Sequence, residues 1–454
     1  IYLIIKFLII DKKIINVLNK LDFKYNFKNY SNSGNTIFLL GIFFLPTALP
    51  IGGFFLLISI IISFCNFKEN FLKQRWNLIF FIILISFLIS TIYSTFINPS
   101  ESLLNFQKSI IWLNLFNWIP IYFAFIGFQI YLKSERQRSL FQKFFIAGTI
   151  PVLISCIMQK FFNIYGPFET LFGTIVWFNY YFSSDQVSGL FNNPNYLGMW
   201  LTLCLPFAIS ELQLQKNNSL NSIILYLINF LTIYFAFATF SRNALLGVII
   251  ALLFILDRKK LILFCILFFT SFLVIVFVLP SFTNILQLSF LDLSEANPIQ
   301  KFASLELNMN NPRIAIWSNA IDFISMRPFL GWGSGSFPHI FYENANLEIP
   351  LTKYQHTHNL IIEIAYNFGI PIALFTTSSI LCLFLNAQKK INALTKSLSN
   401  SHLYKPFIAS LSIFLMAHLT DITYYDGKIS ILFSLLLAGL KNITDENIEL
   451  KDNY

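Results

Sequence analysis

Residues 37–64 read IFLLGIFFLPTALPIGGFFLLISIIISF, and they decide how many times the chain can cross a membrane. The run is apolar throughout, but Pro46, Pro50, Gly52 and Gly53 stand near its middle. Proline lacks a backbone donor and glycine adopts strained conformations, so this cluster favours a tight turn. We therefore expect two short helices that cross twice, rather than one long helix.

The composition of the whole chain agrees with a membrane protein. Of its 454 residues, 56% are hydrophobic and 12% are charged, and the mean hydropathy is +0.65. Soluble domains are about 25% charged and 45–50% apolar. So much apolar surface indicates a polytopic membrane protein. The five cysteines lie in apolar segments without paired spacing, which favours buried small side chains over a disulfide or metal site.

Twelve apolar segments follow one another along the chain, and most approach the roughly 20 residues that a membrane-spanning helix needs. They are 37–49, 51–65, 77–97, 110–131, 143–160, 190–210, 221–240, 243–256, 261–280, 358–386, 406–421 and 428–441. The expected fold is therefore an all-α polytopic membrane helical bundle of about 12 transmembrane helices.

The placement of charge predicts the orientation of these helices. One set of alternate connections holds 23 of the 31 Lys and Arg residues, and the other set holds 8. The acidic residues divide as 10 and 12, so one side is near +13 and the other near −4. Lys and Arg in short loops mark the cytoplasmic side. The net charge of +9 is thus an orientation signal, and we expect no nucleic-acid partner.

These assignments divide the chain into five parts. We expect a cytoplasmic N-terminal segment at 1–36, transmembrane helices 1–9 at 37–280, a large outer loop at 281–357, transmembrane helices 10–12 at 358–441 and a cytoplasmic tail at 442–454.

The outer loop contains a predicted helix that begins NPRIAIW. Asn311 can cap this helix with Pro312 at its first position, and Pro328 ends it. Its apolar face is formed by Trp317, Ala320, Ile321 and Ile324. The sequence GWGSGSF at 331–337 follows, but it lacks the Lys-Ser/Thr ending of a nucleotide-binding loop. We expect its glycines to let the loop approach a lipid or glycan closely.

Two arginines on the outer side are candidates for binding an anion. Arg242 lies in ATFSRNALLG between two apolar segments, where a charge is costly unless it has a partner or faces water. A guanidinium group fits phosphate oxygens with two parallel hydrogen bonds. Arg313 lies in the first turn of the predicted loop helix, whose N-terminus adds partial positive charge. Arg327, at the end of that helix, has a mainly structural role in this interpretation.

His358 is the candidate catalytic base, because an imidazole titrates at about pH 6.5 and can accept a proton from a hydroxyl group near neutral pH. Asn359 or Glu363 could orient its ring, and His356 is the second candidate. We expect no zinc site at the two histidines, because their spacing is not i, i+4 and no third ligand accompanies them. Further along, His418 and Asp421 lie on one turn and could pair with each other.

The sequence resembles the O-antigen ligase / O-antigen polymerase family of bacterial membrane proteins over about residues 185–385. The motifs that carry the resemblance are FNNPNYLG at 191–198, FSRNALLG at 240–247, PRIAIW with RPFLGWGSGSF at 312–337, and HTHNLIIEIAYNFGIP at 356–371. Ile372 follows Gly369 by three residues, where ligases often carry Gly, Thr or Tyr, so ligase and polymerase both stay open.

The resemblance implies glycan transfer from a polyprenyl-diphosphate carrier to an acceptor sugar hydroxyl, on an acceptor glycan or on lipid A–core. The outer loop would then be a large helical periplasmic loop, and the active face of this multi-pass protein would be the periplasmic side of the bacterial inner membrane. Arg242 and Arg313 would hold the diphosphate, and His358 would be the base. The resemblance also implies a mechanism without a metal or other cofactor, in which membrane lipid surrounds the site.

Two alternatives belong to other classes. The ending HLTDITYYDGKISILF at 418–433 is similar to family members labelled inorganic-carbon transporters, which makes a transporter of a small anion such as bicarbonate the runner-up. A transporter predicts broken helices with ionisable groups at mid-membrane and an internal repeat. The chain shows few mid-segment charges and no repeat. The third hypothesis is a scaffold subunit of an envelope assembly.

Overall fold

The structure is a computed structural model that describes residues 30–66, 71–97, 108–170, 175–177, 186–215, 219–256, 259, 312–344, 355–397 and 401–446. The chain divides into two compact units, one of Ile1–Ile255 with Asn319–Tyr454 and one of Leu256–Ser318. The contacts and the pockets described below all lie within the first unit.

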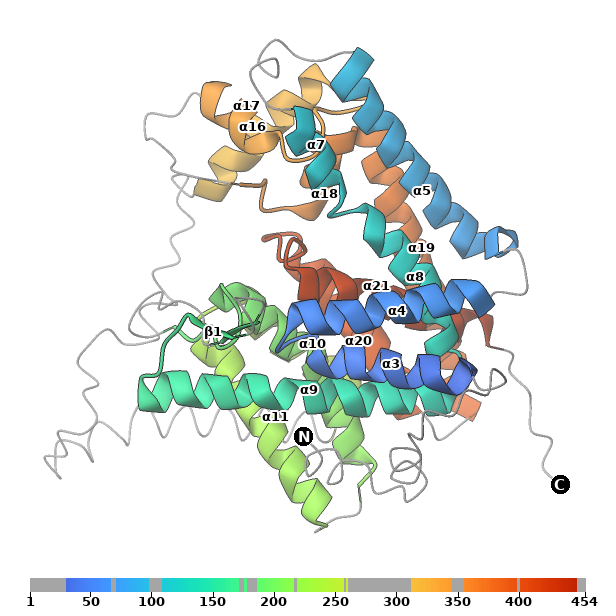
Figure 1. Ribbon diagram of the computed structural model, residues 1–454, viewed down its shortest axis with the longest axis vertical. Helices are drawn as coiled ribbons and strands as arrows, with labels where there is room; N and C mark the ends of the chain where they lie inside the picture. Colours follow the sequence, from blue (N-terminus) through green and yellow to red (C-terminus); the bar gives the residue numbers. More distant parts are fainter. Residues whose placement is uncertain are drawn as a thin grey trace, which may run out of the picture. The chain divides into compact units, whose positions relative to one another are not determined.

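Residues 37–64 lie in two helices, as predicted. Helix α3 (Tyr30–Phe44) and helix α4 (Leu49–Asn66) pack side by side, joined by residues 45–48 (Figure 1). Gly52 makes the close approach possible, because a Cβ atom there would lie 2.7 Å from the Cα atom of Leu45. Pro46 lies in the turn between the two helices, whereas Pro50, Gly52 and Gly53 belong to the first residues of α4. That the two helices cross the membrane twice stays a prediction.

The later helices lie at the predicted apolar segments, but the segments 110–131 and 358–386 are each divided into two helices. They are α5 (Arg75–Ile92) with η3 (Tyr93–Ile97), α7 (Lys108–Leu115), α8 (Ile119–Phe128) with η4 (Gln129–Tyr131), α9 (Glu135–Phe162), α10 (Pro194–Gln213), α11 (Leu220–Ala238), α12 (Arg242–Ile255), α18 (Leu360–Phe368), α19 (Ile370–Ser397), α20 (Lys405–Ala417) and α21 (Gly427–Asp445). The predicted segment 261–280 lies outside the described residues, as do 1–29, 281–311 and 447–454.

Seven helices in the described ranges are long and apolar enough to cross a membrane, and three shorter apolar helices accompany them. Together with the helix order, this confirms a largely α-helical membrane class. The count of about 12 transmembrane helices and the periplasmic location of the 281–357 loop stay predictions.

Helix α10 is the centre of the bundle and packs against α11, α12 and α20. Sixteen of its 20 residues are buried, as expected for a helix that is apolar on all sides. Small residues bring α12 close, because a Cβ atom on Gly247 would lie 2.8 Å from the Cβ atom of Thr202. This packing holds the first residues of α10 and α12 at the same end of the bundle.

The other end of the bundle is held by buried polar contacts. Arg138, near the start of α9, is fully buried and bonds both carboxylate oxygens of Glu446 at 3.1 and 2.9 Å. Its other terminal nitrogen donates to the carbonyl oxygens of Leu132 and Lys133. The hydroxyl of Tyr404 donates to Glu135 at 2.6 Å. These contacts join the start of α9 to the C-terminal end of α21.

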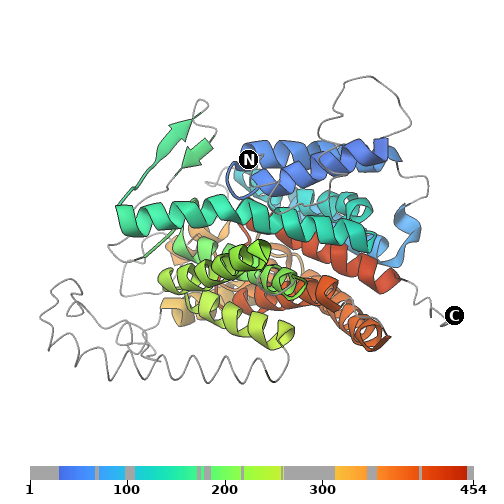
Figure 2. The same cartoon turned by 90° about the horizontal axis from the view of Figure 1, so that it is seen from below.

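A short hairpin adds strand structure that the sequence analysis did not predict. Strands β1 (Phe168–Thr170) and β2 (Ile175–Trp177) pair antiparallel, with Phe168 opposite Trp177, in the connection between α9 and α10 (Figure 2). Each strand has three residues, which is too few to show an alternating pattern of polar and apolar side chains.

Two helices form the described part of the predicted outer loop. Helix α16 (Pro312–Met326) begins at the predicted proline and ends before Pro328, while Asn311, its predicted cap, lies outside the described residues. Ala320, Phe323 and Ile324 are buried, but Ile321 is 56% exposed. Ile321 therefore does not pack against protein with the rest of the predicted apolar face. Helix α17 (Phe337–Asn344) follows the glycine-rich sequence.

The glycine-rich sequence packs against protein, which corrects the expectation of a loop that approaches lipid or glycan. Gly331 has φ +65°, and a Cβ atom there would lie 2.6 Å from the backbone of Asn367. Trp332 and Gly333 donate their backbone N–H groups to the carbonyl oxygens of Tyr366 and Asn367. The loop thereby fixes the C-terminal end of α18, next to the break at Gly369.

We expect Gly369→Ala to destabilise the protein by roughly 1–3 kcal/mol, because the residue has φ +97° and side chains are strained there. A Cβ atom would also collide with the carbonyl oxygen of Phe329. Thermal unfolding of the purified protein in detergent measures the effect. Gly53→Ala is the matched control, since a Cβ atom at this helical position meets nothing within 4 Å and should be neutral or stabilising. Equal unfolding temperatures for the two variants would contradict the packing argument.

Candidate functional site

His358 stands immediately before helix α18 in a strained backbone conformation. Its φ is +55°, a value that residues other than glycine rarely adopt. The strain is held by its neighbours: the backbone N–H of His358 donates to Nδ1 of His356 at 3.3 Å. Asn359 caps α18 by accepting from the N–H groups of Ile361 and Ile362. Strain held in this way is common where a side chain must be aimed at a substrate.

The ring of His358 is oriented by Asp421, which follows helix α20. Nδ1 of His358 lies 2.9 Å from Oδ1 of Asp421, and the side chains are 22% and 8% exposed. Asp421 is fixed in turn by the backbone N–H of Ile422 at 2.9 Å and the side-chain amide of Asn195 at 3.0 Å. With Nδ1 donating to the carboxylate, a neutral imidazole carries its basic lone pair on Nε2.

Asp421 therefore replaces two expectations from the sequence. In the described residues the ring of His358 contacts Asp421, whereas Asn359 and Glu363 contact backbone groups around it. The ring nitrogens of His418 contact other groups. Nδ1 of His418 lies 2.7 Å from the carbonyl oxygen of Phe414, and its Nε2 lies 3.3 Å from the hydroxyl of Thr423. The signal that could have identified Asp421 is a lone carboxylate at the end of an apolar segment on the outer side.

Asn359 and Glu363 position the segment that carries His358. The amide of Asn359 donates to the carbonyl oxygen of Leu419 at 2.9 Å, which ties the start of α18 to the residues before Asp421. Glu363 is buried and accepts from the N–H of Thr357 at 2.9 Å and from the hydroxyl of Tyr425 at 2.6 Å. Burial and the adjacent Glu363 raise the pKa of Tyr425, so its phenol remains a donor.

His356 lies beside His358 and faces Tyr425. The ring centroids of the two histidines are 4.3 Å apart, and the His356 ring lies 5.8 Å from that of Tyr425. His356 therefore forms one wall of the site. Within the described ranges, no group of three or more potential ligand side chains is arranged to hold a metal ion.

Arg242 lies at the same end of the bundle as His358. It is the first residue of α12 and is exposed, and Asn243 beside it binds the segment that leads to Asp421. Oδ1 of Asn243 accepts from the hydroxyl of Thr420 at 2.9 Å, and its Nδ2 donates to the carbonyl oxygen of Ala417 at 3.3 Å. The guanidinium group thus emerges one residue away from the contacts that hold the His358–Asp421 pair.

The other two arginines considered from the sequence are Arg313 and Arg327. Arg313 is the second residue of α16 and belongs to the smaller unit, so its closeness to His358 stays a prediction. The guanidinium carbon of Arg327 lies 4.5 Å from the ring centroid of Trp332, which agrees with a structural role. Burial lowers the pKa of Arg327.

Two residues of this site were not predicted from the sequence. Asn195, in the second position of α10, supports Asp421 as described above. Lys428 donates its ammonium group to the carbonyl oxygen of Leu190 at 2.9 Å and lies 4.1 Å from the ring centroid of Phe191. It thereby fixes the segment that leads into α10 and into Asn195.

Part of the chain is similar to a known protein family. Residues 227–377 match the O-antigen ligase family model. These residues, about a third of the chain, are similar to an O-antigen ligase domain. The matched residues include Arg242, Arg313, His356, His358 and the first two turns of α18, whereas Asn195 and Asp421 lie outside them.

A curated relative of the ligase domain is the ComP-specific O-oligosaccharyltransferase of Acinetobacter baylyi (strain ATCC 33305 / BD413 / ADP1). It is 28% identical to the chain over 182 residues, which cover 39% of this chain and 32% of the relative. The chain thus spans about a third of the relative's length. The family match and the relative support a membrane glycan-ligase type of function and give no support to the transporter alternative.

Proposed function

We propose that the protein transfers a glycan from a polyprenyl-diphosphate carrier to a sugar hydroxyl of an acceptor at the periplasmic face of the bacterial inner membrane. The observation that carries the proposal is the His358–Asp421 pair, built beside an arginine within and next to an O-antigen ligase domain. The relative's name, an O-oligosaccharyltransferase, supports an oligosaccharide as the transferred group.

The proposed reaction uses His358 as the general base. The acceptor oxygen attacks the anomeric carbon of the carrier-linked glycan, and the bond from that carbon to the diphosphate oxygen breaks. The acceptor proton passes to Nε2 of His358, and the polyprenyl diphosphate leaves with the bonding electron pair. Asp421 stabilises the imidazolium that forms, because its carboxylate lies 2.9 Å from Nδ1. The proton then returns to solvent.

The leaving diphosphate needs positive charge where its own negative charge develops. Arg242 is exposed at the N-terminus of α12, where the guanidinium group and the helix dipole act together. In the proposal Arg313, the second residue of α16, binds the same diphosphate. Two guanidinium groups supply the charge that a metal ion supplies in other transferases.

The decisive experiment is transfer in vitro by the purified protein from a polyprenyl-diphosphate glycan. Two acceptors are offered in parallel, lipid A–core and a second carrier-linked glycan. Transfer to lipid A–core identifies a ligase, and chain extension on the carrier identifies a polymerase. Hydrolysis or no reaction with either acceptor, under conditions where the protein is folded, would contradict the proposed transfer to a sugar hydroxyl.

We expect Arg242→Lys to lower kcat/KM by about tenfold or more, although the charge is kept. An ammonium group cannot form the two parallel hydrogen bonds that a guanidinium group makes to phosphate oxygens. Initial rates of transfer at varied carrier concentration measure the change. Arg136→Lys, an exposed substitution at the opposite end of the bundle, is the control. Unchanged kcat/KM in the Arg242 variant would exclude bidentate binding of the diphosphate.

A further inference from the structure

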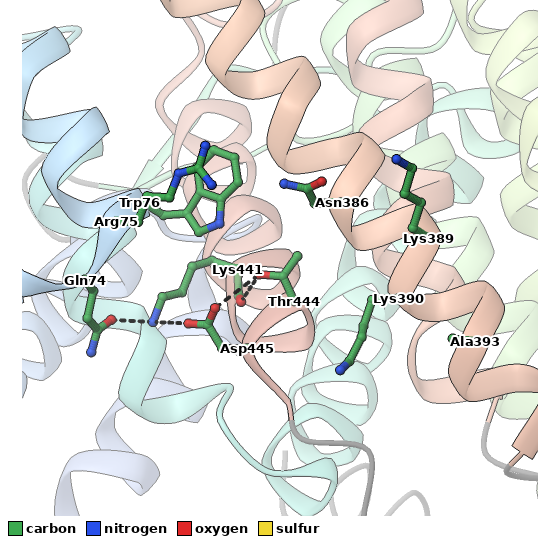
Figure 3. A pocket seen from close by; sticks show the side chains of 10 residues that line it. All are labelled: Gln74, Arg75, Trp76, Asn386, Lys389, Lys390, Ala393, Lys441, Thr444 and Asp445. Atoms are coloured by element: carbon green, nitrogen blue, oxygen red, sulfur yellow. Dashed lines mark hydrogen bonds and ion pairs between the residues drawn. The ribbon is translucent and has the colours of Figure 1, made fainter.

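A cavity lined by charged side chains lies at the end of the bundle remote from His358. It has a volume of about 630 Å³ and is formed by the first residues of α5, the second half of α19 and the last turns of α21. Figure 3 shows Arg75 and Trp76 on one side of it, Lys389 and Lys390 on the other, and Lys441 between them. None of these residues takes part in the proposed reaction.

The cavity is strongly cationic. Its wall carries Arg75, Lys389, Lys390 and Lys441 against one carboxylate, Asp445, which gives a net charge of +3 from four cations and one anion. Lys441 is buried, and its ammonium group bonds Gln74 at 2.5 Å and Asp445 at 3.0 Å. Its charge is thus built into the wall by two partners.

The other three cations differ from Lys441 in their partners. In the part of the chain that the structure describes, neither Arg75, Lys389 nor Lys390 forms an ion pair. Arg75 instead lies with its guanidinium carbon 5.8 Å from the ring centroid of Trp76. Like charges around a cavity of this size repel one another, so an anion bound among them is stabilising.

Helix α21 sets the distance between this cavity and the His358 site. Its first residue, Gly427, follows Tyr425 of the site, and Asp445 at its other end lines the cavity. Eighteen residue steps at about 1.5 Å each place the two about 27 Å apart along the helix. This is close to the ~30 Å hydrocarbon thickness of a bilayer. The cavity therefore lies at the opposite membrane surface from His358, and its Lys and Arg content marks that surface as cytoplasmic.

Exposed apolar side chains continue from the cavity toward mid-membrane on two helices that pack together, α5 and α19. On α5, residues 3, 7 and 10 positions after Arg75 share its helical face and are exposed: Leu78, Ile82 and Ile85. On α19, the exposed residues 4 and 8 positions before Lys389 are Leu385 and Leu381. On each of the two helices, the cationic cavity is thus followed by a row of exposed apolar side chains, here called an apolar stripe.

We propose that this cavity binds the phosphate headgroup of an anionic phospholipid of the cytoplasmic leaflet, with its acyl chains on the two apolar stripes. Basic pockets between membrane helices on the cytoplasmic side suit the phosphates of such lipids, and each Lys or Arg near the surface favours them. A soluble anion would use the charges but not the stripes, so the continuous apolar surface favours a lipid. The site goes beyond the proposed transferase function and does not rest on it.

The test measures lipid binding by the full chain in detergent, by native mass spectrometry and by thermal shift. The probes are cardiolipin, phosphatidylglycerol, phosphatidylcholine and inorganic phosphate. We expect the wild type to retain the two anionic lipids, which raise its unfolding temperature, and to respond little to the other two probes. The triple variant R75Q/K389Q/K390Q should bind cardiolipin at least about tenfold more weakly.

The control variant K133Q/R136Q/K143Q removes the same number of charges from α9 and the residue before its cap, outside the cavity, and should bind as the wild type does. If R75Q/K389Q/K390Q does not fold, the double variant K389E/K390E on α19 takes its place with the same expected loss. Undiminished cardiolipin binding in the cavity variants would overturn the proposal, and so would an equal loss in the control. Inorganic phosphate binding as tightly as the lipids would show that the occupant is a soluble anion.

Discussion

Replacing His358 with alanine should lower kcat for glycan transfer by roughly 10²- to 10⁴-fold, the range that a positioned general base contributes. The imidazole is held 2.9 Å from Asp421 in a backbone conformation that few residues adopt. Removing the ring leaves in place Arg242, which we propose binds the carrier. We therefore expect KM for the carrier to change far less than kcat.

The measurement is the initial rate of transfer in vitro, with the unfolding temperature recorded for each variant. His402→Ala is the matched control, because His402 lies in the short helix before α20 at the opposite end of the bundle. Transfer at the wild-type rate by a folded His358→Ala protein would remove His358 from the mechanism. It would leave the diphosphate-binding role of Arg242 as a separate question.

The second large effect is expected for Asp421→Asn, a loss of kcat of roughly 10²- to 10⁴-fold through the state of His358. An asparagine amide can donate to Nδ1, which moves the ring proton to Nε2 and leaves no lone pair facing the acceptor. The substitution keeps the size of the side chain, but the amide nitrogen then stands in place of Oδ1, which also accepts from the N–H of Ile422, so that hydrogen bond is lost as well. Asp421 thus acts as a positioning residue, and its loss should show in kcat rather than in KM.

Asp322→Asn is the control for this substitution, since Asp322 is an exposed carboxylate on α16. A double variant His358→Ala with Asp421→Asn separates the roles further. If the two residues act as one unit, the double variant should be no slower than His358→Ala alone. Additive losses would mean that Asp421 has a role of its own.

The sequence predicted the helices well because their signals are local. Apolar runs and prolines placed the start of α4 and the proline at the start of α16 close to where the structure has them. The exposed Ile321 shows the limit of this reasoning: periodicity finds an apolar stripe, but not which part of it meets protein. The glycines of 331–335 were misread because their partner, the backbone of residues 366–368, is remote in sequence.

The candidate site was predicted in part. His358 and Arg242 were identified from residue type and from their place beside apolar segments, and the structure places both at one end of the bundle. Asp421 and Asn195 escaped because they are 63 and 163 positions away from His358, as the numbering in the sequence shows. They are brought together by the packing of α10 against α20 and by the hydrogen bonds from Asn359 and Leu360 to residues 418 and 419. Neighbours along the chain, such as Asn359 and Glu363, proved to support the backbone.

The division of the His358–Asp421 pair between two segments limits how this enzyme class can be recombined. A chimaera exchanged at the borders of the ligase match, 227 and 377, would take the imidazole from one parent and the carboxylate from the other. It would also separate Asn195 from the ring that it indirectly steadies. A chimaera that keeps its turnover must therefore take residues 193–195 and 417–426 from the same parent as His358. Such an exchange includes most of the bundle.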